Sequence, residues 1–131
     1  MTSPLQPTVA VIGAGTDRRK FGNKSVRAHH AAGYKVFPIH PTATIVEGLP
    51  AFRALKDLPV STLDRVSVYL PPAIGMTVLS EIVALSPREL WFNPGAESPE
   101  LLQKAQQLGL NVIAGCSIVN LGLSPHDFPD E

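Results

Sequence analysis

The sequence is poor in the residues that mark several protein classes. It has one cysteine in 131 residues, Cys116, which excludes an internal disulfide and gives no sign of an oxidising compartment. No apolar run approaches the roughly 18 residues that a membrane helix needs. The segment 1–8 lacks the basic stretch before an apolar stretch that a secretory signal carries. We therefore expect a cytoplasmic protein without a membrane partner.

Charge is also scarce, and it is unevenly placed. Charged residues make up 17% of the chain and the formal net charge is zero, so we do not expect a nucleic-acid partner, which usually calls for a basic protein. Basic side chains nevertheless gather between positions 18 and 27: Arg18, Arg19, Lys20, Lys24 and Arg27. This cluster favours a phosphate as the ligand. The alternative is a charged loop that only faces solvent.

The remaining composition predicts one packed domain. Apolar residues make up 44% of the chain, which is enough for a core at this length. We expect a single domain over residues 1–131, with its core at about 8–118 and a tail at 121–131 that frays.

Strand-like and helix-like segments alternate along the chain. Short β-branched or aromatic runs that end at glycine or proline predict strands at 9–12, 34–39, 65–70, 89–92 and 110–114. Helical spacing and end signals predict helices at 23–32, 74–85 and 99–108, with one further turn near 52–56. This alternation indicates parallel pairing. The predicted fold class is α/β, a Rossmann-like, doubly wound three-layer sandwich with a five-stranded, mainly parallel sheet.

A turn of glycine or proline follows each predicted strand. In open α/β sheets the ligand binds at the carboxyl edge, where the strand order reverses. The turns expected at this edge are Gly13-Ala14-Gly15, His40-Pro41, Pro71-Pro72, Asn93-Pro94-Gly95 and Gly115-Cys116.

The first of these turns is the most informative. Glycines directly after a strand let backbone N–H groups approach a phosphate. The dinucleotide fingerprint is incomplete, because Arg18 stands where its third glycine belongs. His40 stands at the end of the second strand, where an NAD site needs an acidic residue. Both features disfavour NAD, whereas NADP stays open because His40 would tolerate a 2′-phosphate.

A family resemblance runs through three segments, Val9–Gly15, Lys20–Lys24 and Gly33–Pro41. Together with later matches up to Cys116, they resemble the small CoA-binding protein family in order and spacing. The fold of that family is similar to the nucleotide-binding domain of the succinyl-CoA synthetase alpha subunit. The resemblance covers roughly residues 8–118.

Three positions depart from the family pattern. Gly15 stands in place of the usual Ser, His40 in place of the usual Asn, and Asn93-Pro94 where Gln-Leu or Gln-Ser is common. The ligand that the resemblance implies is coenzyme A, with NADP as the alternative. The residues expected to bind it are Gly13, Ala14, Gly15, Thr16, Lys20, Phe21, Lys24, His40, Pro41, Leu70, Pro71, Pro72, Ile74, Asn93, Gly95 and Cys116.

Each group of these residues is expected to contact a different part of the ligand. Backbone amides at 14–16 would hold the pyrophosphate, and Lys20 and Lys24 would pair with phosphate charge. His40 and the proline after it would border the ribose and adenine. Residues 70–72 and Ile74 would form an apolar wall, and residues 93 and 95 would lie across the switch point.

Cys116 has two interpretations. It is either a small buried residue at a strand end or a thiol near the pantetheine end that could form a mixed disulfide with CoA. The sequence shows no nucleophile, base and acid set and no metal-ligand spacing. We therefore expect a non-catalytic module that stores, senses or protects CoA. The alternatives are a small NADP-dependent reductase and a subunit related to acyl-CoA ligases. The exposed apolar faces of so short a sheet would suit a homodimer.

Overall fold

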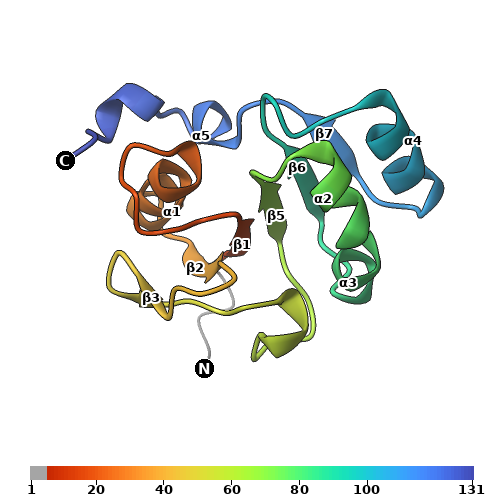
Figure 1. Cartoon of the computed structure of the whole chain (residues 1–131), viewed down its shortest axis with the longest axis horizontal. Coiled ribbons are helices and arrows are strands. Elements are labelled where there is room, and N and C mark those ends of the chain that lie inside the picture. Colours follow the sequence, from red (N-terminus) through yellow and green to blue (C-terminus); the bar gives the residue numbers. More distant parts are fainter. Residues whose placement is uncertain (1–5) are drawn as a thin grey trace.

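A five-stranded parallel sheet forms the centre of the computed structural model, which describes residues 6–131 (Figure 1). The first five residues of the segment 1–8 lie outside this range. The strand order is β2-β1-β5-β6-β7. Their bounds are Thr8–Ile12 for β1, Lys35–Ile39 for β2, Arg65–Val68 for β5, Glu89–Phe92 for β6 and Val112–Ala114 for β7. All four pairings are parallel, which confirms the predicted fold class.

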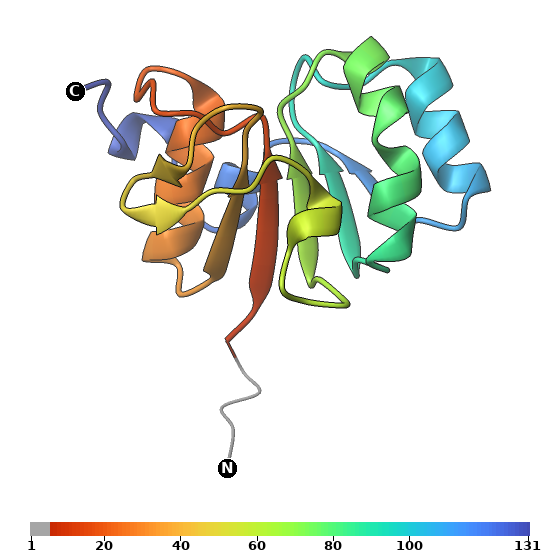
Figure 2. The same ribbon diagram turned by 60° about the horizontal axis from the view of Figure 1, so that its bottom comes forward.

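Helices cover both faces of the sheet. On one side lie α1 (Phe21–Ala31) and α5 (Ser117–Asn120), and on the other lie α2 (Pro72–Thr77), α3 (Leu79–Ala84) and α4 (Pro99–Gln107) (Figure 2). Strand residues alternate between the two layers, because successive side chains point to opposite faces. A continuous apolar strand sequence is therefore what a doubly covered sheet requires. In the described part of the chain, no helix has the length and apolarity to cross a bilayer.

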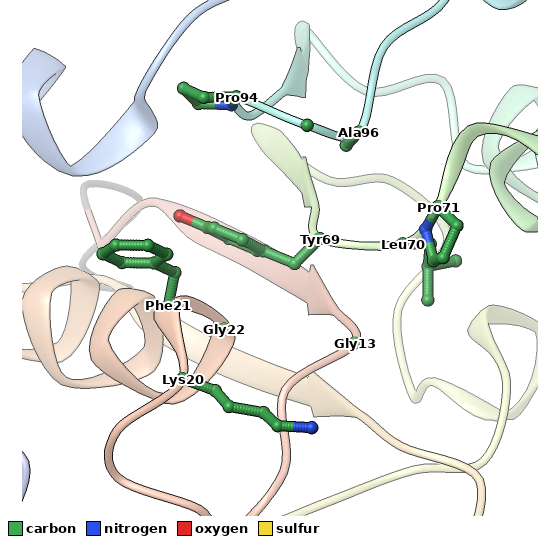
Figure 3. Close-up of a pocket in the computed structure, with 10 residues that line it drawn as sticks. Gly13, Lys20, Phe21, Gly22, Tyr69, Leu70, Pro71, Pro94 and Ala96 are labelled. Atoms are coloured by element: carbon green, nitrogen blue, oxygen red, sulfur yellow. The ribbon is translucent and has the colours of Figure 1, made fainter.

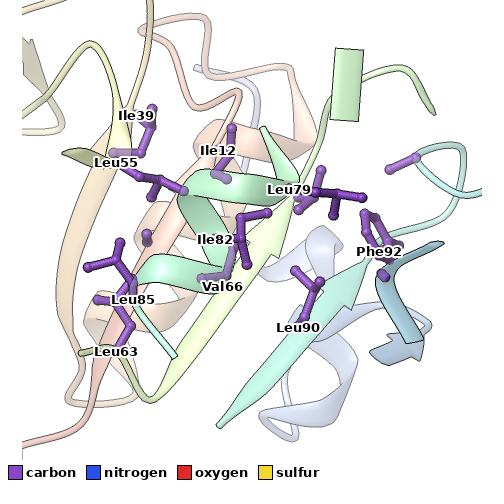
Figure 4. Packing of buried hydrophobic residues seen from close by; sticks show 14 of the residues in the cluster. Ile12, Ile39, Leu55, Leu63, Val66, Leu79, Ile82, Leu85, Leu90 and Phe92 are labelled. Carbon is purple, nitrogen blue, oxygen red and sulfur yellow. The ribbon is translucent and has the colours of Figure 1, made fainter. Parts of the chain in front are cut away.

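The larger half of the core lies between the sheet and the α2–α4 layer. Ile12, Val66 and Leu90 from three strands meet Ile82 of α3, which is fully buried (Figure 4). A smaller cluster around Val9, Val11 and Val26 fixes α1 to the opposite face.

Two helix ends carry the residues that the sequence signals, whereas α1 begins at Phe21, two residues before the predicted start. Gly33 ends α1 with a φ of +92°, and the Ser98 hydroxyl caps α4 by accepting from the Leu101 amide at 3.1 Å. The helix predicted at 74–85 is divided into α2 and α3. The Thr77 hydroxyl donates to the Ile74 carbonyl at 2.6 Å, and this kind of side-chain bond competes with the helix ladder.

Short elements held by tertiary contacts escaped prediction. At positions 45–50, where no element was predicted, β3 (Ile45–Val46) and β4 (Leu49–Pro50) form a hairpin. Its turn places Glu47 and Gly48 at φ values of 51° and 77°. The single turn η1 (Leu55–Asp57) follows, close to the expected turn. Elements this short carry too few residues to show a period.

The tail was expected to fray, and the structure instead packs it against α1. It contains the turn η2 (Pro125–Asp127). The Lys24 amine lies 2.6 Å from Asp130 Oδ1. Arg27 donates to the Pro129 carbonyl at 2.9 Å and lies over the Phe128 ring. These contacts involve residues about 100 positions apart, so no local pattern announces them.

A buried polar network also ties α1 to the sheet. His29 Nδ1 donates to the Ser25 carbonyl oxygen at 2.8 Å, and the Arg65 guanidinium lies 3.4 Å from His29 Nε2. Burial, opposed only in part by the Ser25 bond, lowers the pKa of His29 to about 4. The ring is therefore neutral at pH 7.

Candidate functional site

The candidate site is a cleft at the carboxyl ends of β1, β5 and β6. This is the switch point of the sheet, where neighbouring strands connect to helices on opposite faces. We call it the central cleft. Its volume is about 400 Å³, and its lining residues are Gly13, Lys20, Phe21, Gly22, Tyr69, Leu70, Pro71, Pro94, Gly95 and Ala96 (Figure 3).

The turn after β1 forms the floor of the central cleft. Gly13 has a φ of +91°, and a Cβ there would lie 2.9 Å from the Tyr69 carbonyl oxygen, so only glycine fits. The amides of Gly13 and Ala14 both donate to the Ile39 carbonyl, at 3.0 and 3.2 Å. The Ala14 amide, which was expected to hold a pyrophosphate, is therefore already hydrogen-bonded within the protein. Within residues 6–131, the structure gives no acceptor for the amides of Gly15 and Thr16.

Gly22 performs the function that the incomplete fingerprint lacked. A Cβ at Gly22 would lie 2.5 Å from the Gly13 carbonyl oxygen, so α1 approaches the turn as closely as it does only because this residue is glycine. In the dinucleotide fingerprint the third glycine allows the same close packing of helix and strand. The loop before α1 is longer here, so this glycine stands at position 22 and not at position 18, where the fingerprint spacing places it.

Three of the five basic residues at 18–27 pair with the protein's own carboxylates. Arg18 Nε lies 3.2 Å from Glu47 Oε2, Arg19 pairs with Asp17 at 3.0 Å, and the Lys24–Asp130 contact is described above. Hydrogen bonds from Arg19 lower the pKa of Asp17 to about 2. Glu47 and Asp130 come from the hairpin and the tail, so their ion pairs with Arg18 and Lys24 could not be predicted from the sequence.

Lys20 differs from these three paired residues. It lies at the N-cap of α1 and lines the central cleft, where its side chain extends beside Gly13 (Figure 3). Within the described residues, the structure gives it no carboxylate partner. The next residue, Phe21, leaves 59% of its surface exposed. A cation and an open aromatic ring thus stand together at the mouth of the cleft.

A second hollow continues from the cleft towards β2, and we call it the His40 hollow. Its volume is about 240 Å³. Its walls include the expected residues His40, Pro41, Leu70 and Ile74, together with Arg53, which the sequence did not single out. Glu81 of α3 also lines it. Pro72 begins α2 and does not line any of the hollows described here.

The His40 ring is oriented by the backbone around it. Its Nδ1 accepts from the amides of Thr42 and Ala43, at 3.1 and 2.9 Å. The ring proton of neutral His40 therefore resides on Nε2. A Cβ at Gly15 would lie 3.0 Å from that Nε2 atom. Gly15 and His40, which both depart from the family pattern, are thus neighbours in space.

A third hollow opens on the other side of the cleft, towards β7, and we call it the apolar chamber. Its volume is about 220 Å³, and its walls are Phe21, Tyr69, Asn93, Pro94, Cys116, Ile118 and Pro125. Tyr69 was missed by the sequence analysis because it reads as an ordinary strand residue. Burial raises the pKa of its hydroxyl.

Asn93 lines the apolar chamber, and its side chain is also part of the framework of the site. Its Nδ2 donates to Ser67 Oγ at 2.8 Å and to the Val68 carbonyl at 3.0 Å. Its Oδ1 accepts from the amide and the hydroxyl of Ser117, both at 2.9 Å. Both ends of the amide are therefore engaged inside the protein, and the side chain fixes the turn that carries residues 94–96. Among residues 6–131, no three His, Cys, Asp or Glu side chains gather in a way that could hold a metal ion.

Comparison with known proteins gives one family and several solved structures. A family model described as a CoA binding domain matches residues 7–122. A conserved hypothetical protein from Pyrococcus furiosus is 29% identical, with a TM-score of 0.77 over 88% of this chain and 99% of that chain. A protein from Thermus thermophilus is 31% identical, with a TM-score of 0.78 over 93% of this chain and 89% of that chain.

A larger protein shares the same fold in one of its parts. It is the dinucleotide forming acetyl-coenzyme A synthetase 1 of Ca. Korarchaeum cryptofilum, solved in complex with phosphate and ADP. It is 26% identical, with a TM-score of 0.70, over 81% of this chain and 25% of that chain.

Proposed function

This chain belongs to the CoA binding domain family, and from that membership we propose that it binds coenzyme A along the carboxyl edge of its sheet, as a module that stores, senses or protects the cofactor. The observation that carries the proposal is the continuity of three hollows. The His40 hollow shares Gly13 and Leu70 with the central cleft. The cleft shares Phe21, Tyr69 and Pro94 with the apolar chamber. The resulting trough suits a long ligand with an anionic middle.

The middle of the trough supports the pyrophosphate. Lys20 supplies a positive charge at the cleft, and Gly15 and Thr16, whose amides have no acceptor within residues 6–131, belong to the loop that leads to it. A cation together with backbone N–H groups is a usual combination for binding phosphate. Of the two lysines predicted to hold phosphate, we keep Lys20, because Lys24 is already paired with Asp130.

The His40 hollow supports the adenosine end. Leu70, Ile74 and Pro41 offer apolar surface for the adenine ring. Arg53 lines the same hollow and is exposed, so we assign it to the 3′-phosphate that distinguishes CoA from its dephosphorylated form. Glu81 would accept a hydrogen bond from the adenine amino group.

Titration calorimetry with CoA, 3′-dephospho-CoA and NADP tests this assignment. Lys20→Glu should weaken CoA binding about 10- to 100-fold, the loss expected for a charged hydrogen bond, and should flatten its salt dependence. Lys104→Glu, on the exposed surface of α4, serves as the matched control and should bind CoA normally. Arg53→Ala should remove most of the preference for CoA over 3′-dephospho-CoA. Equal affinity of the Lys20 and Lys104 variants, or tighter binding of NADP than of CoA, would overturn the proposal.

A second function draws on the synthetase relative. Because this chain covers 25% of that synthetase, it could supply the CoA site of a ligase whose other parts lie on a separate chain. Copurification of an ATP-binding partner, followed by an assay for CoA-dependent release of phosphate, would support this role. Purification of the chain alone with CoA retained, as seen by native mass spectrometry, supports the stand-alone module instead.

A further inference from the structure

We propose that the apolar chamber receives the acyl group of a short-chain acyl-CoA, so that this chain binds the thioester in preference to free CoA. The inference rests on the proposed function, since it places the CoA thiol where the central cleft opens into the chamber. Phe21, Tyr69 and Pro94 line both spaces, so the cleft and the chamber adjoin at these three residues. We place the sulfur end of the ligand at this border, from which its acyl group would enter the chamber.

The chemistry of the chamber walls favours a hydrocarbon guest. The polar side chains of two wall residues, Asn93 and Tyr69, are already engaged by the protein. The Asn93 amide is bonded at both ends, and the Tyr69 hydroxyl lies 3.3 Å from Ser117 Oγ. A sugar or a base would leave its own hydrogen-bonding groups unmatched here, which costs binding energy. An alkyl chain incurs no such cost.

The size of the chamber limits the length of that chain. A cavity of about 150 Å³ lined by apolar side chains holds one benzene molecule, and this chamber measures about 220 Å³. By the same proportion it holds roughly six to nine carbon atoms, so a butyryl chain fits and a palmitoyl chain does not. A long fatty acyl chain would have to leave through the mouth of the trough.

The tail closes the chamber and so sets its length. Pro125, in the turn η2, forms one wall, and the Lys24–Asp130 ion pair and the Arg27 contacts fasten this segment to α1. Residue 125 lies after the range matched by the family model, which ends at 122. The selectivity for acyl length is thus built from a segment outside the family match.

Calorimetry with CoA, acetyl-CoA, butyryl-CoA and palmitoyl-CoA tests the inference on the whole chain. Each buried methylene should tighten binding about fourfold. Butyryl-CoA has two more methylenes than acetyl-CoA and should therefore bind about 15-fold more tightly, whereas palmitoyl-CoA should lose this gain. Cys116→Leu fills the chamber and should abolish the difference between butyryl-CoA and acetyl-CoA. Cys116→Ser keeps the volume and should preserve it. Val119→Leu, on the same helix but 58% exposed, is the matched surface control and should also preserve it.

The outcomes separate this inference from the proposed function. If no CoA compound binds, both fail. If CoA binds but butyryl-CoA binds no more tightly than acetyl-CoA, the chamber holds no acyl group and only the inference fails. Should Cys116→Leu not fold, Pro125→Ala takes its place. That variant opens the tail wall and should move the preference from butyryl-CoA towards longer chains, and an unchanged preference would refute the role of the wall.

Discussion

The contact between Gly15 and His40 leads to a prediction about how the site tolerates change. In Gly15→Ser, the new Cβ would lie 3.0 Å from both Cδ2 and Nε2 of His40, which is tighter than an ordinary contact. The imidazole resists displacement because its Nδ1 accepts from the amides of Thr42 and Ala43. Moving the ring would weaken both bonds. At about 1 kcal/mol for each bond, the substitution should cost about 1–2 kcal/mol of folding stability.

His40→Asn should remove the conflict. An asparagine side chain is shorter, and its carbonyl oxygen accepts from the amides of the following residues in an Asx turn. It can therefore replace Nδ1 while leaving space above position 15. His40→Asn alone should change stability by about 0.5 kcal/mol or less. The double variant should then be more stable than Gly15→Ser by about 1 kcal/mol, although it carries one substitution more.

Urea unfolding of the four proteins closes the double-mutant cycle. The expected coupling energy between positions 15 and 40 is about 1 kcal/mol in favour of the pair. Gly15→Ser combined with Lys104→Ala, on the far layer of the sandwich, provides an additive control. If the stability costs of the two single substitutions add up to the cost of the double variant within about 0.3 kcal/mol, the two residues do not constrain each other. The explanation of the two family departures as one paired change would then be wrong.

Three further predictions concern α1 and the tail. Because the pKa of His29 is about 4 in the folded protein and about 6.5 when unfolded, its contribution to stability is complete above pH 6.5. About 3 kcal/mol should be lost as the pH falls from 6.5 to 4, and His29→Gln should remove this part of the urea-midpoint profile. Gly22→Ala should weaken CoA binding more than about tenfold and destabilise the fold by about 1–3 kcal/mol, whereas Gly33→Ala, at the other end of α1, should destabilise without changing affinity for CoA. Asp130→Asn should release Lys24 and tighten CoA binding about twofold to fivefold in low-salt calorimetry, and weaker binding would show that the ion pair supports the site.

Much of the fold was visible in the sequence because its signals are local. Strand runs such as Val9–Ile12 are apolar throughout, as a doubly covered parallel strand must be. Gly33 and Ser98 mark helix ends through their own conformation and hydroxyl group. The location of the site followed from a general property of open α/β sheets. His40, Leu70 and Lys20 could therefore be assigned to one edge from the order of the predicted elements alone.

Which groups at that edge are already bonded within the protein, and which remain open to a ligand, could not be predicted. The reason is that this depends on contacts between distant segments. The sequence grouped Lys20 and Lys24 as equivalent cations, and only the packed tail distinguishes them by giving Lys24 a carboxylate partner 106 residues away. It identified the turn at 13–15 as the phosphate loop, whereas the Ile39 carbonyl decides which of its amides are already bonded. Chain order thus determined the sheet, its edge and the residue types placed there. Which of those groups remain open to a ligand was decided by tertiary packing, since each donor or charge can satisfy a neighbour in the fold before it meets a ligand.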